Sequence, residues 1–195
     1  MTQHTGPGST PLGAEEQQDL IPSLATQAEL NEWERENILE GRRWAFSERE
    51  FKSRDPVTEG YVRELHRRMF NSTWKWAGTY RNSEKNIGVP VDQIRERIGA
   101  LLGNVKYWTT HATYRGDEIA IRLHHELALI HPFPNGNGRH ARLMADVAAV
   151  KIGNGPFSWG SKEIVPPGAT RESYLRALRA ADNGDFGPLL KFSRS

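Results

Sequence analysis

The chain contains no cysteine and no long apolar run. The absence of cysteine excludes a disulfide scaffold and a cysteine-liganded zinc site, and it is typical of proteins in a reducing compartment, so we expect the cytoplasm. No stretch approaches the roughly 18 apolar residues of a membrane span, so we expect no membrane partner. The opening residues, MTQHTGPGSTPLG, lack the charged and apolar regions of a signal peptide.

An excess of one charge sign is also missing. Lys and Arg number 26 against 24 Asp and Glu, which gives a net charge of +2, although the sequence pI is about 9.0. This scattered basicity does not form the patch that nucleic-acid-binding domains carry, so a nucleic-acid partner is the least favoured hypothesis. A hydrophobic content of 37% is ordinary for a globular protein, and 195 residues suffice for one domain with a buried core.

The chain divides into a polar beginning and one helical domain. Residues 1–22 are rich in Gly, Pro, Thr and Gln and predict a flexible tail, and residues 23–195 form the domain. A capping-box pattern, Thr26 to Glu29, begins a helix that we expect over about 27–45. Apolar residues recur at helical spacing in six further segments, which are 57–69, 91–108, 117–130, 138–151, 172–181 and part of 184–193.

One segment departs from helical spacing. Residues 79–90, TYRNSEKNIGVP, carry short β-type pieces around a polar middle, which predicts a hairpin. The expected fold class is therefore all-α, a helical bundle with one β-hairpin. Four tryptophans are interpreted as core residues, namely Trp33, Trp44, Trp74 and Trp76.

The most informative stretch is HPFPNGNGRH at 131–140. Pro132 ends one helical segment directly after His131. Glycines then lead into the next helix, whose N-terminus offers unpaired N–H groups and a positive dipole to an anion. Arg139 and Arg142 share a face of its first turn and are suited to a di- or triphosphate. A neutral His131 at the other lip of the loop can accept a proton from a hydroxyl nucleophile.

Each part of this stretch has a plainer interpretation. A histidine at a helix end often interacts with the helix dipole, and Asn-Gly sequences are common turns. The occurrence of all these parts together within ten residues favours a functional site. His124 lies seven residues before His131 and is interpreted as a core residue rather than a pocket residue. Asp146, four residues after Arg142, is expected to pair with it along the helix.

These residues resemble the Fic family, whose pattern is HxFx(D/E)GNGRxxR. The match covers every fixed position except residue 135, and it is accompanied by WAGTYR at 76–81. The likeness extends over about residues 25–193 and is greatest to the subgroup called mobile mystery protein B. The resemblance implies a Fic-type bundle with a hairpin flap.

The activity that the resemblance implies is AMP transfer from ATP to a Ser, Thr or Tyr hydroxyl of a target protein, with Mg²⁺ as cofactor. It makes the chain a nucleotidyltransferase of the protein adenylyltransferase type. His131 corresponds to the catalytic base. The residues that correspond to nucleotide-binding positions are Phe133, Gly136, Asn137, Gly138, Arg139 and Arg142.

The resemblance also implies two protein contacts. The hairpin 82–89 corresponds to a flap that docks the target segment by strand addition, through Lys85, Asn86, Ile87 and Gly88. A second partner with a helix-turn-helix is implied in a bacterial, toxin–antitoxin-like setting. The oligomeric state is not predicted.

Asn135 departs from the family pattern, which has Asp or Glu at the Mg²⁺-ligating position. Its carbonyl is a weak candidate ligand without negative charge. Weaker metal binding, another nucleotide and lost activity stay open. The alternative function is accordingly a Fic-like nucleotide-binding regulatory module with weak or no transferase activity.

An inhibitory helix is the last implied feature, with the pattern (S/T)xxxE(G/N). Glu40 and Gly41 fit this pattern, whereas Glu36 stands where Ser or Thr is expected. At about 100° per residue, Glu40 lies near Trp33 and Trp44, so we expect it to point inward. A buried carboxylate needs a cationic partner, for which Arg142 is the candidate. The alternative is a solvated glutamate.

Overall fold

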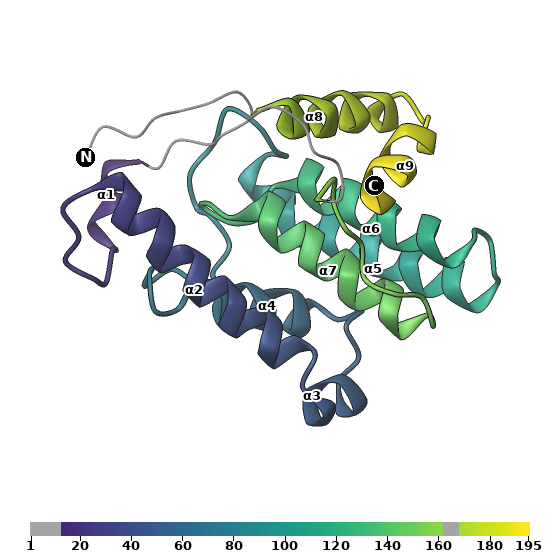
Figure 1. The fold of residues 1–195 in the computed structure, drawn as a ribbon, viewed down its shortest axis with the longest axis horizontal. Coiled ribbons are helices and arrows are strands. Elements are labelled where there is room, and N and C mark those ends of the chain that lie inside the picture. Colours follow the sequence, from purple (N-terminus) through teal and green to yellow (C-terminus); the bar gives the residue numbers. More distant parts are fainter. Residues whose placement is uncertain (1–12, 162–167) are drawn as a thin grey trace.

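The computed structural model describes residues 13–161 and 168–195, and these ranges are mainly helical, with a long connection at 71–90 (Figure 1). The helices, in chain order, are α1 (Ala14–Gln18), α2 (Gln27–Ala45), α3 (Glu48–Ser53), α4 (Glu59–Phe70), the 3₁₀ turn η1 (Val91–Gln93), α5 (Ile94–Thr110), α6 (Gly116–Ile130), α7 (Asn137–Lys151), α8 (Ala169–Asp182) and α9 (Gly187–Arg194). None of them within these ranges is long and apolar enough to cross a bilayer.

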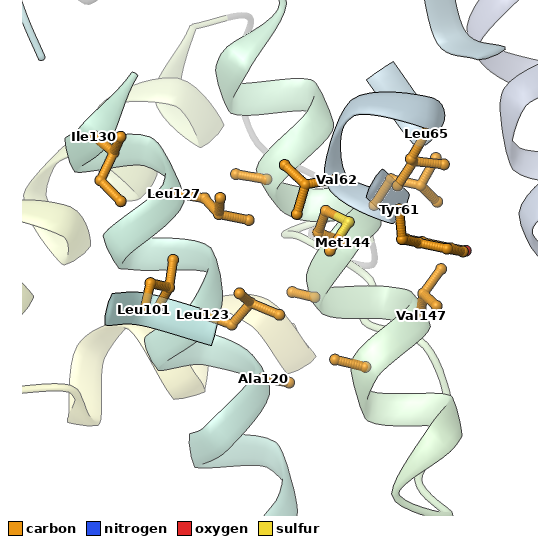
Figure 2. Packing of buried hydrophobic residues seen from close by; sticks show 14 of the residues in the cluster. Tyr61, Val62, Leu65, Leu101, Ala120, Leu123, Leu127, Ile130, Met144 and Val147 are labelled. Atoms are coloured by element: carbon orange, nitrogen blue, oxygen red, sulfur yellow. The ribbon is translucent and has the colours of Figure 1, made fainter. Parts of the chain in front are cut away.

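The centre of the bundle is the pair α6 and α7. Helix α5 packs on α6, α4 packs on α7, and α2 packs on α4 (Figure 1). Side chains of α6 meet Met144 of α7 between the two helices, and Val62 of α4 lies beside it (Figure 2). Small buried residues let α7 pack closely, as its sequence predicts; they are Ala141, Ala145, Ala148 and Ala149.

Helix α2 covers the predicted range. The Thr26 hydroxyl accepts the Glu29 N–H, and the Glu29 carboxylate accepts the Thr26 N–H, so the predicted capping box is present. Gly41 lets α2 pack closely on α4, because a Cβ at this position would lie 2.8 Å from the Met69 side chain. The inward-facing residues of α2 are Leu30, Glu34, Asn37, Gly41 and Ala45.

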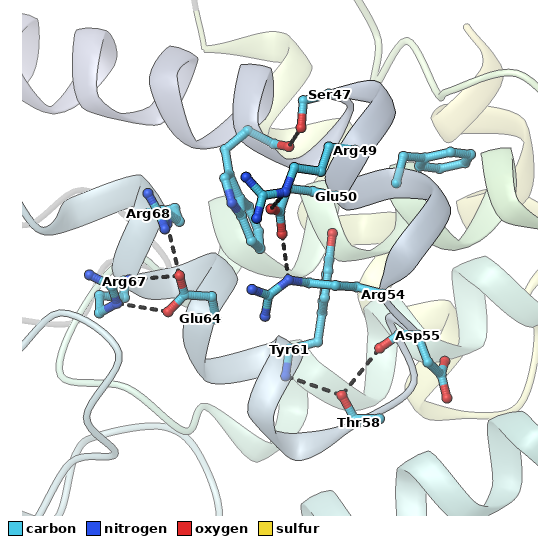
Figure 3. A network of polar contacts seen from close by, with 12 residues as sticks. Ser47, Arg49, Glu50, Arg54, Asp55, Thr58, Tyr61, Glu64, Arg67 and Arg68 are labelled. Atoms are coloured by element: carbon cyan, nitrogen blue, oxygen red, sulfur yellow. Dashed lines mark hydrogen bonds and ion pairs between the residues drawn. The ribbon is translucent and has the colours of Figure 1, made fainter.

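Short polar contacts fix the start and the outer face of α4 (Figure 3). The Thr58 hydroxyl accepts the Tyr61 N–H at 3.2 Å and donates to the Asp55 carbonyl. On the outer face, Glu64 accepts hydrogen bonds from both Arg67 and Arg68. Between the two helices, His140 of α7 contacts the Val62 carbonyl of α4 at 2.9 Å, which places α4 beside the N-terminus of α7.

The described part of the predicted tail is structured. Residues 14–18 form α1, and Leu20 makes an antiparallel bridge with Trp74. Ile21 N–H donates to the Thr73 carbonyl at 2.8 Å. Contacts with residues far along the chain therefore order this segment, and the sequence pattern gives no sign of them. Residues 1–12 lie outside the described residues.

The predicted hairpin is wrong: residues 79–90, all of them described, contain no strand. The Arg81 guanidinium takes the place of a ladder by donating to the Ser83 and Val89 carbonyls. The backbone N–H groups at the two ends, Arg81 and Val89, donate instead to the carbonyls of Pro132 and Ile130. The segment is therefore a loop held against the 131–140 stretch, and we call residues 81–89 the flap loop.

The four tryptophans differ in how deeply they are buried. Trp74 and Trp76 are buried and stacked with ring centroids 5.1 Å apart. Trp44 is half-buried. Trp33 is 45% exposed and donates its indole N–H to the Ser72 carbonyl, so its assignment to the core is wrong. An indole spans polar and apolar surroundings well, which is why its presence does not mark an inward face.

Candidate active site

His131 is the residue that ends α6. It adopts the left-handed conformation, with φ 54° and ψ 58°, and is only 8% exposed. This conformation costs a non-glycine residue about 1–2 kcal/mol, so other contacts must maintain it. The Arg81 guanidinium donates to the His131 carbonyl at 2.8 Å, and Gly88 lies against the His131 Cβ. The flap loop thus holds His131 in a strained position, which is typical of functional sites.

The protonation state of His131 follows from its surroundings. Nδ1 lies 3.4 Å from the Ala128 carbonyl. A carbonyl only accepts, so Nδ1 carries the proton and Nε2 carries the lone pair. Burial, with smaller contributions from the Arg81 and Lys85 charges, lowers the pKa of His131 to about 4. The ring is therefore neutral at pH 7 and presents Nε2 as a base.

The two glycines of the loop differ in their structural roles. Gly136 has φ +77°, and a Cβ there would lie 2.5 Å from the Phe70 ring, so both backbone and packing require glycine. Gly138, in the first turn of α7, has nothing within 4 Å of its Cβ direction. Its missing side chain therefore leaves space beside the N-terminal N–H groups of α7. The N–H groups that begin α7 and this space have the geometry of an anion-binding site, which we call the anion cradle.

Phe133 and Asn137 support the loop from inside. The Asn137 side chain accepts the Phe133 N–H at 2.9 Å and donates to the Phe133 carbonyl at 2.8 Å. Phe133 is fully buried and Asn137 is nearly so. Their contact with a nucleotide stays a prediction. Both arms of Asn137 are used to close the loop.

The two arginines of the stretch lie toward different neighbours. Arg139 pairs with Glu34 of α2, at 2.6 Å, and its guanidinium lies over the Phe70 ring. Arg142 lies over the Tyr174 ring of α8, with 5.3 Å between its guanidinium carbon and the ring centroid. The N-terminus of α7 is therefore flanked by cationic groups that contact α2 and α8.

Glu34, and not Glu40, is the acid of α2 that reaches this stretch. Glu40 is exposed, whereas Glu34 is 8% exposed and also accepts the Trp74 indole N–H at 2.8 Å. The inward orientation expected for Glu40 is wrong, because the two tryptophans that indicate its face are not buried: Trp33 is exposed and Trp44 is half-buried. Six residues separate the two glutamates, which places them about 120° apart around the helix. Arg142 has Tyr174 beside it rather than Glu40.

Two further expectations concern the inner faces of α6 and α7. His124 is fully buried and contacts the Tyr174 hydroxyl at 3.1 Å, so its interpretation as a core residue is confirmed. Asp146 does not pair with Arg142 as expected. It pairs with Arg42 of α2 at 2.8 Å and accepts the Trp159 indole N–H, because its inward position brings these more distant donors closer.

The side chain of Asn135 is turned toward its own loop. Its carbonyl oxygen accepts the Gly136 N–H at 2.5 Å and an Arg139 N–H at 3.3 Å. A carbonyl oxygen has two lone pairs, and the amide's other arm is an NH₂ donor that offers no lone pair to a cation. Residue 135 therefore does not fit the part of a Mg²⁺ ligand in this arrangement. The described residues also hold no group of three or more His, Cys, Asp or Glu suited to a metal.

The flap loop combines a tethered part with an exposed part. The Lys85 side chain is buried and paired with Glu16 of α1, and the Ser83 hydroxyl donates to the same carboxylate at 3.0 Å. Asn86 and Ile87 are exposed next to Gly88, which lies against His131. Sequence reasoning missed Glu16 because nothing local distinguishes it from the neighbouring charged residues.

A neutral histidine beside a glycine-rich, arginine-bearing helix N-terminus in a helical bundle is typical of domains that bind phosphate groups. Residues 56–149 match the Fic/DOC family model. The chain therefore contains a Fic/DOC segment at residues 56–149.

Curated relatives agree with this family match. The protein adenylyltransferase fic-1 of Caenorhabditis elegans is 29% identical over 145 residues, which are 72% of this chain and 27% of that protein. The chain thus spans about a quarter of the length of such curated relatives.

Solved structures establish the fold. C. elegans Fic-1 (residues 134–508) has a TM-score of 0.63 at 23% identity and covers 92% of this chain and 52% of its own. BepC from Bartonella tribocorum, solved with bound AMPPNP, has a TM-score of 0.63 at 17% identity and covers 93% and 97%. The similarity therefore extends well beyond the segment that matches the family model.

Proposed function

We propose that this chain is a protein adenylyltransferase that moves AMP from ATP to a Ser, Thr or Tyr hydroxyl of a target protein. The observation that carries the proposal is the pairing of a neutral His131, with its lone pair on Nε2, and the anion cradle that begins α7. The curated relatives are named protein adenylyltransferases, and the similar BepC structure contains an ATP analogue.

The proposed reaction follows from these groups. Nε2 of His131 takes the proton of the target hydroxyl, whose oxygen attacks the α-phosphorus of ATP. The bond from the α-phosphorus to the bridging oxygen breaks, and pyrophosphate leaves. The N–H groups that begin α7 and the guanidiniums of Arg139 and Arg142 neutralise the phosphates. A bound divalent cation would add charge neutralisation, but no step here depends on one, because Asn135 does not fit as its ligand.

The flap loop is the proposed target-docking element. Its residues 86–88 are exposed beside His131, and its backbone forms no ladder of its own. An extended target segment can pair with such a backbone and bring its hydroxyl to the base without a sequence code. A helix-turn-helix partner protein remains part of the proposal on the resemblance alone, and a cytoplasmic location on the absence of cysteine.

We also propose that the site is auto-inhibited, because Glu34 of α2 holds Arg139. While its carboxylate holds Arg139 at 2.6 Å, this guanidinium is directed toward α2 and away from an incoming triphosphate. Arg139 must exchange a charge-assisted bond for a phosphate contact when ATP binds. The strength of ATP binding therefore depends on how readily Glu34 of α2 releases Arg139.

Replacing Glu34 with glutamine is expected to tighten ATP binding about tenfold, because a hydrogen bond to a charged group contributes about 1.5–3 kcal/mol. Glutamine still accepts the Trp74 indole N–H, so the packing of α2 is kept. Glu40→Gln, an exposed change on the same helix, is the control and should leave the affinity unchanged. Calorimetry with ATP and labelling of protein with radioactive ATP measure both consequences. Tighter binding in the Glu40 variant instead would refute the assignment.

The orientation of Asn135 supports a second candidate function, a module that binds nucleotide and transfers nothing. Asn135→Asp separates the two. An aspartate accepts the same two hydrogen bonds and keeps a second oxygen for a cation, so its ATP affinity should become Mg²⁺-dependent. The unchanged protein should show the same Kd in Mg²⁺ and in EDTA. If only the Asn135→Asp variant transfers AMP, the unchanged protein is the binding module. If ATP binding by the unchanged protein depends on Mg²⁺, residue 135 or its neighbours do ligate the cation.

A further inference from the structure

His66 of α4 lies directly beneath the anion cradle. Its ring is fully buried between two backbone groups, with Nδ1 3.0 Å from the Gly78 nitrogen and Nε2 3.0 Å from the Asn135 carbonyl oxygen. A backbone N–H only donates and a carbonyl only accepts. His66 is therefore neutral, with its proton on Nε2. Burial lowers its pKa well below the usual value, which keeps it in this form.

The ring itself cannot rotate or shift without disturbing the loop. It is stacked on Phe133, with 3.7 Å between centroids and 19° between planes, and it contacts Phe70 at 4.7 Å. Phe133 is in turn held by both arms of Asn137. The position of the Nε2 proton is thus fixed by packing on one side and by the Gly78 N–H on the other.

The Nε2 proton of His66 determines the direction of the Gly136 N–H, which is the first amide of the anion cradle. The peptide bond between Asn135 and Gly136 is trans, since the described residues contain no cis peptide. In a trans peptide the carbonyl and the N–H point in opposite directions. Because the Asn135 backbone carbonyl points at His66, the Gly136 N–H points away from the core, where it donates to the side-chain oxygen of Asn135 at 2.5 Å; an anion in the cradle would take the place of that oxygen. The following left-handed turn at Gly136 leads directly into α7.

We propose that His66 is a positioning residue of the nucleotide site, which orients the Gly136 amide by binding the Asn135 carbonyl. The inference rests on the proposed function only in naming the nucleotide as the anion. His66 itself does not touch substrate. An apolar residue of similar size would leave two buried backbone groups without partners, which is costly. A histidine in one tautomer satisfies both, and the sequence pattern alone does not single it out.

Two amide variants separate the two ends of the ring. His66→Gln places a donor where Nε2 is and keeps the bond to Asn135, whereas His66→Asn places an acceptor where Nδ1 is and keeps the bond to Gly78. Each loses one buried hydrogen bond and similar packing, so their thermal stabilities should fall by similar amounts. We expect His66→Gln to bind ATP with nearly the original Kd and His66→Asn to bind about tenfold more weakly. Equal ATP affinities of the two variants, or the reverse order, would overturn the proposal.

Two measurements on the loop do not require activity. In ¹⁵N NMR spectra, the Gly136 amide signal should move in His66→Asn and stay in place in His66→Gln. The ring nitrogens of the unchanged protein should report the Nε2–H tautomer; an Nδ1–H tautomer would overturn the proposal, as would an unmoved Gly136 signal in His66→Asn. If the unchanged protein binds ATP but labels no protein, the proposed transferase function fails while the positioning role is still decided by these signals.

Discussion

Replacing His131 with alanine is expected to reduce AMP transfer by about 10²–10⁴-fold, the range that a positioned general base contributes. The reason is the tautomer: Nδ1 faces the Ala128 carbonyl, so Nε2 has the lone pair that takes the hydroxyl proton. ATP binding should be unchanged, because the phosphates are held by α7 and its arginines. The effect should therefore appear in kcat and not in the Kd of ATP.

The matched control is His111→Ala, which changes an exposed histidine at the end of α5. It should leave both ATP binding and transfer unchanged. Transfer by His131→Ala within a few-fold of the unchanged protein would show that another group takes the proton. A parallel loss of ATP affinity would show that the histidine supports the cradle rather than the chemistry.

Acid should destabilise the protein steeply below pH 6.5. Four buried histidines have pKa values lowered by burial: to about 3 for His124, to about 4 for His131 and His140, and well below the usual value for His66. Their folded-state pKa values lie below the unfolded value of about 6.5, so the unfolded state binds more protons. The stabilisation is fully present above pH 6.5 and is lost progressively as the pH falls toward 4.

The expected magnitude is about 1.4 kcal/mol per histidine for each pH unit below the unfolded pKa. Urea titrations at pH 7, 6, 5.5 and 5 measure the free energy of unfolding directly. His140→Gln keeps a donor for the Val62 carbonyl, which Nε2 of His140 approaches at 2.9 Å, and removes one titrating group. Its pH dependence should be shallower by about one proton. A free energy that stays constant between pH 7 and 5 would contradict the neutral state of these rings.

The helical bundle was predictable because its causes are local. The capping box that begins α2 lies within four residues, and the apolar stripes of α6 and α7 recur at helical spacing. The glycine-rich stretch 131–140 likewise carries its chemistry in consecutive residues. These features depend on backbone geometry and burial, which a sequence pattern records.

The flap loop was not predictable as a loop because its cause is a single buried guanidinium. Arg81 binds three carbonyls, including that of His131, and thereby replaces the strand pairing that the residue types of 79–90 favour. A charged residue in a β-type segment gives no sign that it will be buried. Only the position of the 131–140 stretch, which is distant in sequence, makes that burial possible.

The acid of α2 was misassigned for a related reason. Helical spacing gives the angle between residues but not which face turns inward, and Trp33 and Trp44 are poor markers of that face. The Trp33 indole is exposed, so Glu34 rather than Glu40 is the buried glutamate. The position of His66 beneath the loop was similarly hidden, because it depends on how α4 packs against α7 and not on spacing within α4.

The most direct test of the proposed function uses ATP labelled at one phosphate at a time. The Glu34→Gln variant is incubated with candidate target proteins and with ATP carrying the label on either the α- or the γ-phosphate. The account predicts that protein becomes labelled from the α-phosphate and not from the γ-phosphate, and that His131→Ala in the same background abolishes the label. Label transferred from the γ-phosphate, or α-label that persists without His131, would contradict it.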